Sequence, residues 1–167
     1  MKKKNAQCRN GFAYAYVIGV FLVVSLFASL ILFELNQAIT ENHIRSMSMK
    51  SYYLCYQAAD ATVAALTMDD NDVINDMINH SNYHRTDKIF HTDETNNNIG
   101  ESSITLEKEP HKYYGKNKEW IVAYIETRIP DERAYRKGED FIFKGSVMIL
   151  LDNPEVRIYN INPDNLS

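Results

Sequence analysis

An uncharged, apolar block separates a short basic segment from a long polar remainder. Residues 12–33 read FAYAYVIGVFLVVSLFASLILF and contain no charged side chain. A helix of this length spans roughly 33 Å at about 1.5 Å per residue, enough to cross the hydrocarbon core of a bilayer. We therefore predict a membrane-spanning helix over 12–33.

The charges on either side of this block predict its orientation. Residues 1–11 contain four basic residues and no acid, and Glu34 follows the block. The positive-inside rule then places the N-terminus in the cytoplasm and the remainder outside. A secretory signal would have a shorter apolar core followed by a small-residue cleavage site. Because residues 34–40 (ELNQAIT) offer no such site, we expect a single-pass protein of the cytoplasmic membrane whose anchor is retained.

The helical pattern continues beyond the membrane, in an extracytoplasmic helical region over 34–80. Residues 20–99 contain neither glycine nor proline. Small and apolar side chains recur at intervals of three and four residues, so they would lie on one face of a helix. These residues are Ile44, Met47, Ser51, Leu54, Ala58, Ala61 and Ala65. We predict that the long helix ends near Leu66. A short second helix over 70–80 has an apolar face of Val73, Ile74, Met77 and Ile78.

The pattern changes from helical to alternating in the last third of the chain. Residues 81–100 are polar and predict a surface loop. Within 101–167, β-branched and aromatic enrichment predicts strands at 103–108, 118–129, 140–151 and 156–161. One face of the second strand has Ile121, Ala123, Ile125, Thr127 and Ile129, and one face of the third has Phe141, Phe143, Val147, Ile149 and Leu151.

Short connections between these strands predict an antiparallel sheet. Asp152, Asn153 and Pro154 form a tight turn before the last strand, and the charged run after Pro130 forms a loop. The apolar face of the sheet needs a cover, and the outer half of the long helix is available. The expected fold class is α+β: a long N-terminal helix packed on a small antiparallel sheet.

The charge distribution excludes some function classes. The chain has 18 basic and 22 acidic residues, and the four basic residues in 1–11 leave 14 against 22, a net charge of −8, for the rest. Such an acidic domain repels phosphate, so we predict no nucleic-acid partner.

Candidate catalytic and metal-binding residues do not form a known motif. The acidic run of Asp69, Asp70, Asn71, Asp72 and Asp76 departs from a calcium loop at Val73 and fits helix capping better. His80 and His84 have the i, i+4 spacing of a helical metal pair, with His91 nearby, but no HExxH frame or cysteine partners accompany them. We predict no enzyme activity, metal or cofactor.

Cysteines and tyrosines have structural interpretations. Cys55 is the only cysteine after the basic segment, and we predict a small buried group in the helix stripe. The aromatic cluster of Tyr52, Tyr53 and Tyr56 either packs against the sheet or anchors an interface with another subunit. Tyr113 and Tyr114 are predicted to lie on the solvated rim of a hairpin.

The order of basic leader, Gly11, Phe12 and a long uncharged helix resembles that of type IV prepilins. The resemblance implies that a prepilin peptidase cleaves between Gly11 and Phe12 and methylates the new amine of Phe12. Residues 1–11 would then be a cytoplasmic leader. A second resemblance is to the signature of PilX-like minor pilins, here Gln57, Ala58, Ala59, Asp60 and Ala61. Together the two resemblances cover residues 1–66.

One residue departs from the family pattern. Most pilins have glutamate as the fifth mature residue, where it pairs with the terminal amine of a neighbouring subunit, and this chain has Tyr16 there. A similar loss in the K-type minor pseudopilin implies a minor subunit that initiates or caps a filament. The implied partners are other pilins, the prepilin peptidase, the inner-membrane assembly platform and the membrane. The alternative is a signal-anchored extracytoplasmic ligand-binding domain that is not processed.

Overall fold

The computed structural model describes residues 4–68, 72–79, 84–130 and 140–162, and the side chains of the first helix from Phe12 onward. The elements, in chain order, are α1 (Lys4–Thr67), α2 (Asp72–Asn79), β1 (His84–Thr92), β2 (Asn98–Tyr113), β3 (Lys116–Pro130), β4 (Asp140–Leu150) and β5 (Asn153–Asn160). They divide into two units, Met1–Ile44 and Arg45–Ser167. The first unit is the N-terminal part of α1, and the second contains the rest of α1, α2 and all of the sheet.

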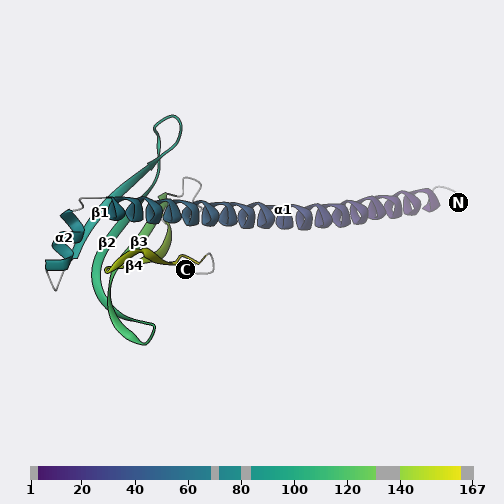
Figure 1. The fold of residues 1–167 in the computed structure, drawn as a ribbon. Coiled ribbons are helices and arrows are strands. Elements are labelled where there is room, and N and C mark those ends of the chain that lie inside the picture. The colour runs from purple at the N-terminus through teal and green to yellow at the C-terminus, as the bar shows by residue number, and fades with distance from the viewer. Residues whose placement is uncertain (1–3, 69–71, 80–83, 131–139, 163–167) are drawn as a thin grey trace. The chain divides into compact units, whose positions relative to one another are not determined.

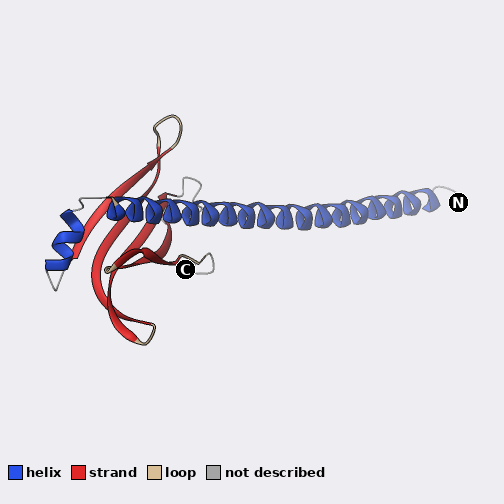
Figure 2. Ribbon diagram, in the orientation of Figure 1, coloured by secondary structure: helices blue, strands red, loops and turns tan. Residues whose placement is uncertain are grey.

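The five strands form one antiparallel sheet in sequence order, β1-β2-β3-β4-β5, shown in Figures 1 and 2. Each strand pairs antiparallel with its chain neighbours. The second unit places the last turns of α1 and all of α2 against one face of this sheet, here called the inner face. The predicted α+β class is confirmed, and the fold is consistent with the one that the pilin resemblance implies.

The inner face has the strand side chains that alternation predicted. Ile121, Ala123, Ile125, Thr127 and Ile129 are all buried. On β4, Phe143, Val147 and Ile149 are buried and Leu151 packs against them. Period-two patterning therefore identified the correct face of both central strands.

The buried stripe of α1 differs from the predicted one at both ends. Ser51, Leu54 and Ala58 are buried as expected, whereas Ile44, Ala61 and Ala65 are exposed. The stripe is two residues wide and continues through the neighbouring buried residues Cys55, Ala59, Thr62, Val63 and Leu66. A helix lying on a broad sheet buries more than a single row of residues, and this is why the narrow stripe was wrong beyond Ala58.

The short second helix also differs in one residue. α2 packs Val73, Ile74 and Met77 into the core, and Met77 is completely buried. Ile78 is exposed, so its predicted place on the apolar face was wrong. Eight residues make barely two turns, which leaves room for only one buried row.

The predicted surface loop over 81–100 was wrong, because β1 occupies 84–92 and β2 begins at Asn98. β1 pairs along its length with β2 and places Ile89 against the core, while its other face is solvated and polar apart from the exposed Phe90. An edge strand with one solvated face has little apolar signal in its sequence. The true turn is short, and the Asp93 carboxylate accepts hydrogen bonds from the backbone N–H groups of Thr95 and Asn97, both at 2.8 Å.

Two tight turns agree with the sequence. Tyr114 and Gly115 connect β2 to β3 with φ values of 47° and 74°, as a type I′ hairpin requires. Leu151 and Asp152 connect β4 to β5, so the turn predicted over 152–154 begins one residue earlier, and Asn153 and Pro154 belong to β5. The charged run over 131–139, also predicted as a loop, lies outside the described residues.

Candidate functional site

The apolar segment of α1 is exposed along its whole length within the first unit. Every large apolar side chain from Phe12 to Leu35 is at least 45% exposed. Soluble monomers rarely expose apolar patches larger than a few hundred Å². Of the described helices, only α1 is long and apolar enough to cross a membrane.

The predicted processing residues lie at the start of this segment. Gly11 is within α1, and Phe12 follows it with an exposed fraction of 80%. Tyr16 lies one helical turn further and is 70% exposed. The side chain at this position has a neutral hydroxyl in place of a carboxylate, so it offers no negative charge to a neighbouring amine.

The predicted signature residues divide between the core and the surface of the second unit. Ala58 and Ala59 are buried between α1 and the sheet, and Gln57 and Ala61 are exposed. The Asp60 carboxylate accepts a hydrogen bond from the Tyr159 hydroxyl at 2.9 Å. This segment therefore holds α1 against the sheet, through two small side chains and one polar contact with β5.

The close approach of α1 to the sheet is visible at Gly145 of β4. A Cβ atom at this position would lie 3.1 Å from the Cys55 sulfur, so a larger residue would push the helix away. The Cys55 side chain is fully buried, which confirms the predicted small core group. Burial raises the pKa of the thiol to about 11, although a hydrogen bond with Thr127 opposes this shift.

A chain of buried hydrogen bonds extends from Cys55 to the edge of the sheet. Thr127 and Ser102 join their hydroxyl groups at 2.8 Å, and Ser102 joins the His91 Nε2 at the same distance. All three residues are buried, and burial lowers the pKa of His91. With no solvent access to the thiol or to either hydroxyl, the chain holds β1, β2, β3 and α1 together and is not accessible to a substrate.

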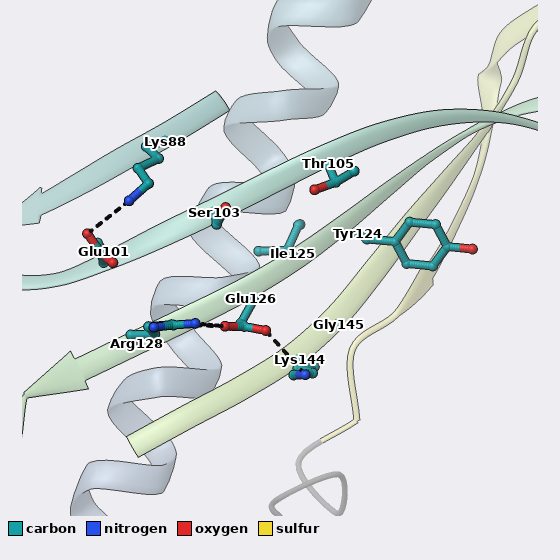
Figure 3. Close-up of a pocket in the computed structure, with 10 residues that line it drawn as sticks. All are labelled: Lys88, Glu101, Ser103, Thr105, Tyr124, Ile125, Glu126, Arg128, Lys144 and Gly145. Atoms are coloured by element: carbon teal, nitrogen blue, oxygen red, sulfur yellow. Dashed lines mark hydrogen bonds and ion pairs between the residues drawn. The ribbon is translucent and has the colours of Figure 1, made fainter. Parts of the chain in front are cut away.

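A second feature is a depression of about 410 Å³ on the outer face of the sheet, opposite α1 (Figure 3). Four strands contribute to it, from Lys88 on β1 to Lys144 on β4. Glu126 lies at its centre and accepts hydrogen bonds from Nε and Nη2 of Arg128 at 2.9 and 2.6 Å. Lys144 approaches the other oxygen of Glu126 at 3.2 Å.

These contacts fix the charge states in the depression. The Arg128 hydrogen bonds, aided by Lys144, hold the pKa of Glu126 below its usual value, and Glu126 in turn raises the pKa of Arg128. The Tyr124 hydroxyl donates to Glu109 at 2.7 Å, which raises its pKa to about 12. At neutral pH, Glu126 and Arg128 are therefore both charged and Tyr124 is a neutral donor.

Other candidates from the sequence are not brought together. His84 lies on β1, where it faces Glu107, so a helical pair with His80 does not form, and His80 itself lies outside the described residues. The side chains of Asp69, Asp70, Asn71 and Asp72 also lie outside the described part. Within that part, no group of three His, Cys, Asp or Glu side chains is arranged to hold a metal ion.

The tyrosines have separate roles. Tyr52 packs edge-on against Phe143 with ring centroids 5.8 Å apart, whereas Tyr53 is 61% exposed. Tyr56 stacks on Tyr159 at 5.4 Å. Tyr114 is 89% exposed at the hairpin, as predicted. Tyr113 is half-buried against Trp120, so its predicted place on the solvated rim was wrong.

Comparison with protein-family models, with characterised proteins and with solved structures found no match for this chain.

Proposed function

We propose that the chain is a minor pilin or pseudopilin that helps to initiate or cap a type IV pilus-like filament. The observation that supports this most strongly is the fully exposed apolar segment from Phe12 to Leu35, in the same helix that further on packs against a small sheet. A bilayer covers such a segment before assembly, and apolar helices of other subunits cover it afterwards. We propose a structural role without enzyme activity.

The transfer between these two environments has a small free-energy difference. Lipid tails and neighbouring apolar helices are similar surroundings, so an uncharged helix is stable in both. The basic leader opposes the transfer, since each lysine or arginine favours anionic headgroups by about 1 kcal/mol. Cleavage between Gly11 and Phe12 removes four such residues and allows extraction.

The neutral side chain of Tyr16 supports a minor position in the filament. Without a carboxylate, this subunit cannot pair with the terminal amine of the next one, so it belongs at an end where one such pairing is not needed. Its proposed partners are other pilins, the prepilin peptidase and the inner-membrane assembly platform. The orientation has the N-terminus inside, and the second unit outside the cytoplasmic membrane.

The experiment is mass spectrometry of the mature N-terminus in the native host, compared between the wild type and the Gly11→Val variant. The proposal predicts an N-methylated Phe12 in the wild type and an intact leader in the variant. Gly19→Val is the matched control, since no neighbouring atom lies within 4 Å of an added Cβ there. Intact Met1 in the wild type, or normal cleavage of Gly11→Val, contradicts the proposal.

The depression on the outer face favours one alternative, a signal-anchored ligand-binding domain. This alternative predicts that the leader stays attached and that the protein remains in the membrane fraction. The same mass measurement therefore decides between the two.

A further inference from the structure

The depression on the outer face is hollow because short side chains on one strand lie between longer side chains on its neighbours. Ser103 and Thr105 on β2 form its floor with short side chains. Longer side chains of Lys88, Tyr124 and Arg128 rise around them from the neighbouring strands, as Figure 3 shows. The resulting volume of about 410 Å³ is within the range of roughly 300 to 1,000 Å³ that is common for small-molecule sites.

The charges in the depression nearly balance one another. Three cations, Lys88, Arg128 and Lys144, accompany two carboxylates. Glu126 pairs with Arg128 and Lys144, and Glu101 lies 3.9 Å from the Lys88 ammonium. A single surplus positive charge within an acidic domain attracts neither anions nor cations strongly.

Two groups of the depression keep hydrogen-bond donors that the ion pairs do not use. Arg128 has five N–H donors, of which Nε and one N–H of Nη2 point to Glu126, and Lys144 has three. On the neighbouring strand, Ser103 lies opposite Glu126 and Thr105 lies opposite Tyr124, so their hydroxyls add polar groups to the same surface. Such an arrangement can exchange several hydrogen bonds with a neutral, hydroxyl-rich ligand.

Tyr124 adds an apolar surface to this polar site. Its ring is anchored at the far end by the hydrogen bond to Glu109 and remains 43% exposed. An aromatic face that is held in place can pack against the C–H groups of a sugar ring, while its neighbours bind the hydroxyls.

We propose that this depression is a binding site for a neutral saccharide. Saccharides combine many hydroxyls with an apolar ring face. The polar groups of the depression can bind the hydroxyls, and the Tyr124 ring can pack against the apolar face. The proposal does not require leader cleavage, so it and the pilin function can fail independently.

The test uses the full chain in lipid nanodiscs without sugar headgroups, because glycoside detergents and glycolipids would compete. The probes are neutral oligosaccharides of hexoses and N-acetylhexosamines, with uronic-acid and sialylated oligosaccharides as the acidic set. We expect saturable binding of at least one neutral probe. Tyr124→Ala should weaken its binding at least tenfold, and Ser103→Tyr, which fills the hollow and leaves the ion pairs in place, should abolish it.

The matched control is Tyr114→Ala, since Tyr114 is an exposed tyrosine on the hairpin outside the depression. The affinity of this variant for the neutral probe should stay within twofold of the wild-type affinity. Fluorescence of Trp120, the single tryptophan and a buried neighbour on the same strand, reports whether each variant is folded. Three results would overturn the proposal: no binding of neutral probes, equal binding by the folded Ser103→Tyr variant, or stronger binding of the acidic set.

Discussion

The two parts of α1 differ in both hydrophobic content and surroundings, since 12–35 is almost wholly apolar and 45–67 mixes apolar with polar and charged residues. In the first unit, Phe12 to Leu35 are exposed in every direction around the helix. In the second, the buried side chains follow one face, and many of them are small, such as Ser51, Ala58 and Ala59. A helix that is apolar all round requires lipid or other helices, whereas a helix with one small-residue face needs only its own sheet. One continuous element thus combines an exposed apolar surface with an intramolecular, packed one.

The largest expected effect is on the intramolecular part. Ala59→Glu places an unpaired carboxylate in the core at a position with 0% exposure, and we expect a loss of several kcal/mol, enough to unfold the second unit. Ala61→Glu, two residues away and exposed, should be nearly neutral. Thermal unfolding followed by Trp120 fluorescence measures both. Equal melting temperatures would contradict the described packing of α1.

A charge in the exposed apolar part of α1 should act differently. Val24→Arg lies near the middle of the apolar segment, and a central arginine costs about 2.5 to 3.5 kcal/mol of insertion free energy. We expect less protein in the alkaline-washed membrane fraction and an unchanged melting temperature of the second unit. The conservative Val24→Leu should behave as the wild type. Loss of domain stability in Val24→Arg would show that the segment has an intramolecular partner.

The polar contact between α1 and β5 should have a smaller effect. Tyr159→Phe removes the hydroxyl that donates to Asp60, and the expected loss is about 1 kcal/mol of unfolding free energy. In Asp60→Ala, the same Tyr159→Phe change should cost little, because the acceptor is already absent. A double-mutant cycle measures this coupling, and additive effects would mean that the contact contributes nothing.

The smallest predicted effect is a dependence of folding stability on pH through the titration of His91. Burial lowers the folded-state pKa of His91 below that of the unfolded chain, so the unfolded state binds more protons. This contribution to stability is complete above the unfolded pKa, near 6.5, and is lost as the pH falls through the folded value. Denaturant titrations between pH 7.5 and 5 should show a decrease in the free energy of unfolding, and this decrease should be smaller in His91→Gln. An identical decrease in the variant would assign it to other groups.

Much of the fold can be predicted from local patterns in the sequence, because the apolar residues of most helices and strands recur with one clear spacing. Apolar and small residues spaced three or four apart predicted α1 as far as Leu66. Alternation of apolar and polar residues predicted the inner faces of β3 and β4. β1 was missed because both of its faces are mostly polar, and Ile89 is its only apolar residue packed against the core. The tight approach at Gly145 and Cys55 depends on how two distant segments meet, which local periodicity does not encode.

The candidate sites differ in the same way. The processing residues Gly11 and Phe12 are contiguous, so the sequence alone predicts them, and they remain predictions. The depression and the chain from Cys55 to His91 each combine residues from four elements. The alternating Tyr124, Glu126 and Arg128 mark a polar outer face, but only the register across β1 to β4 places Lys88 and Lys144 beside them.

The central claim is that the apolar part of α1 leaves the membrane for a filament once the leader is removed. The most direct measurement is the mass of the N-terminal peptide in sheared surface filaments and in membranes from the same cells. We predict that filaments contain only chains beginning with N-methylated Phe12, together with other pilins. Finding the chain only in membranes, with Met1 to Gly11 still attached, would contradict the account.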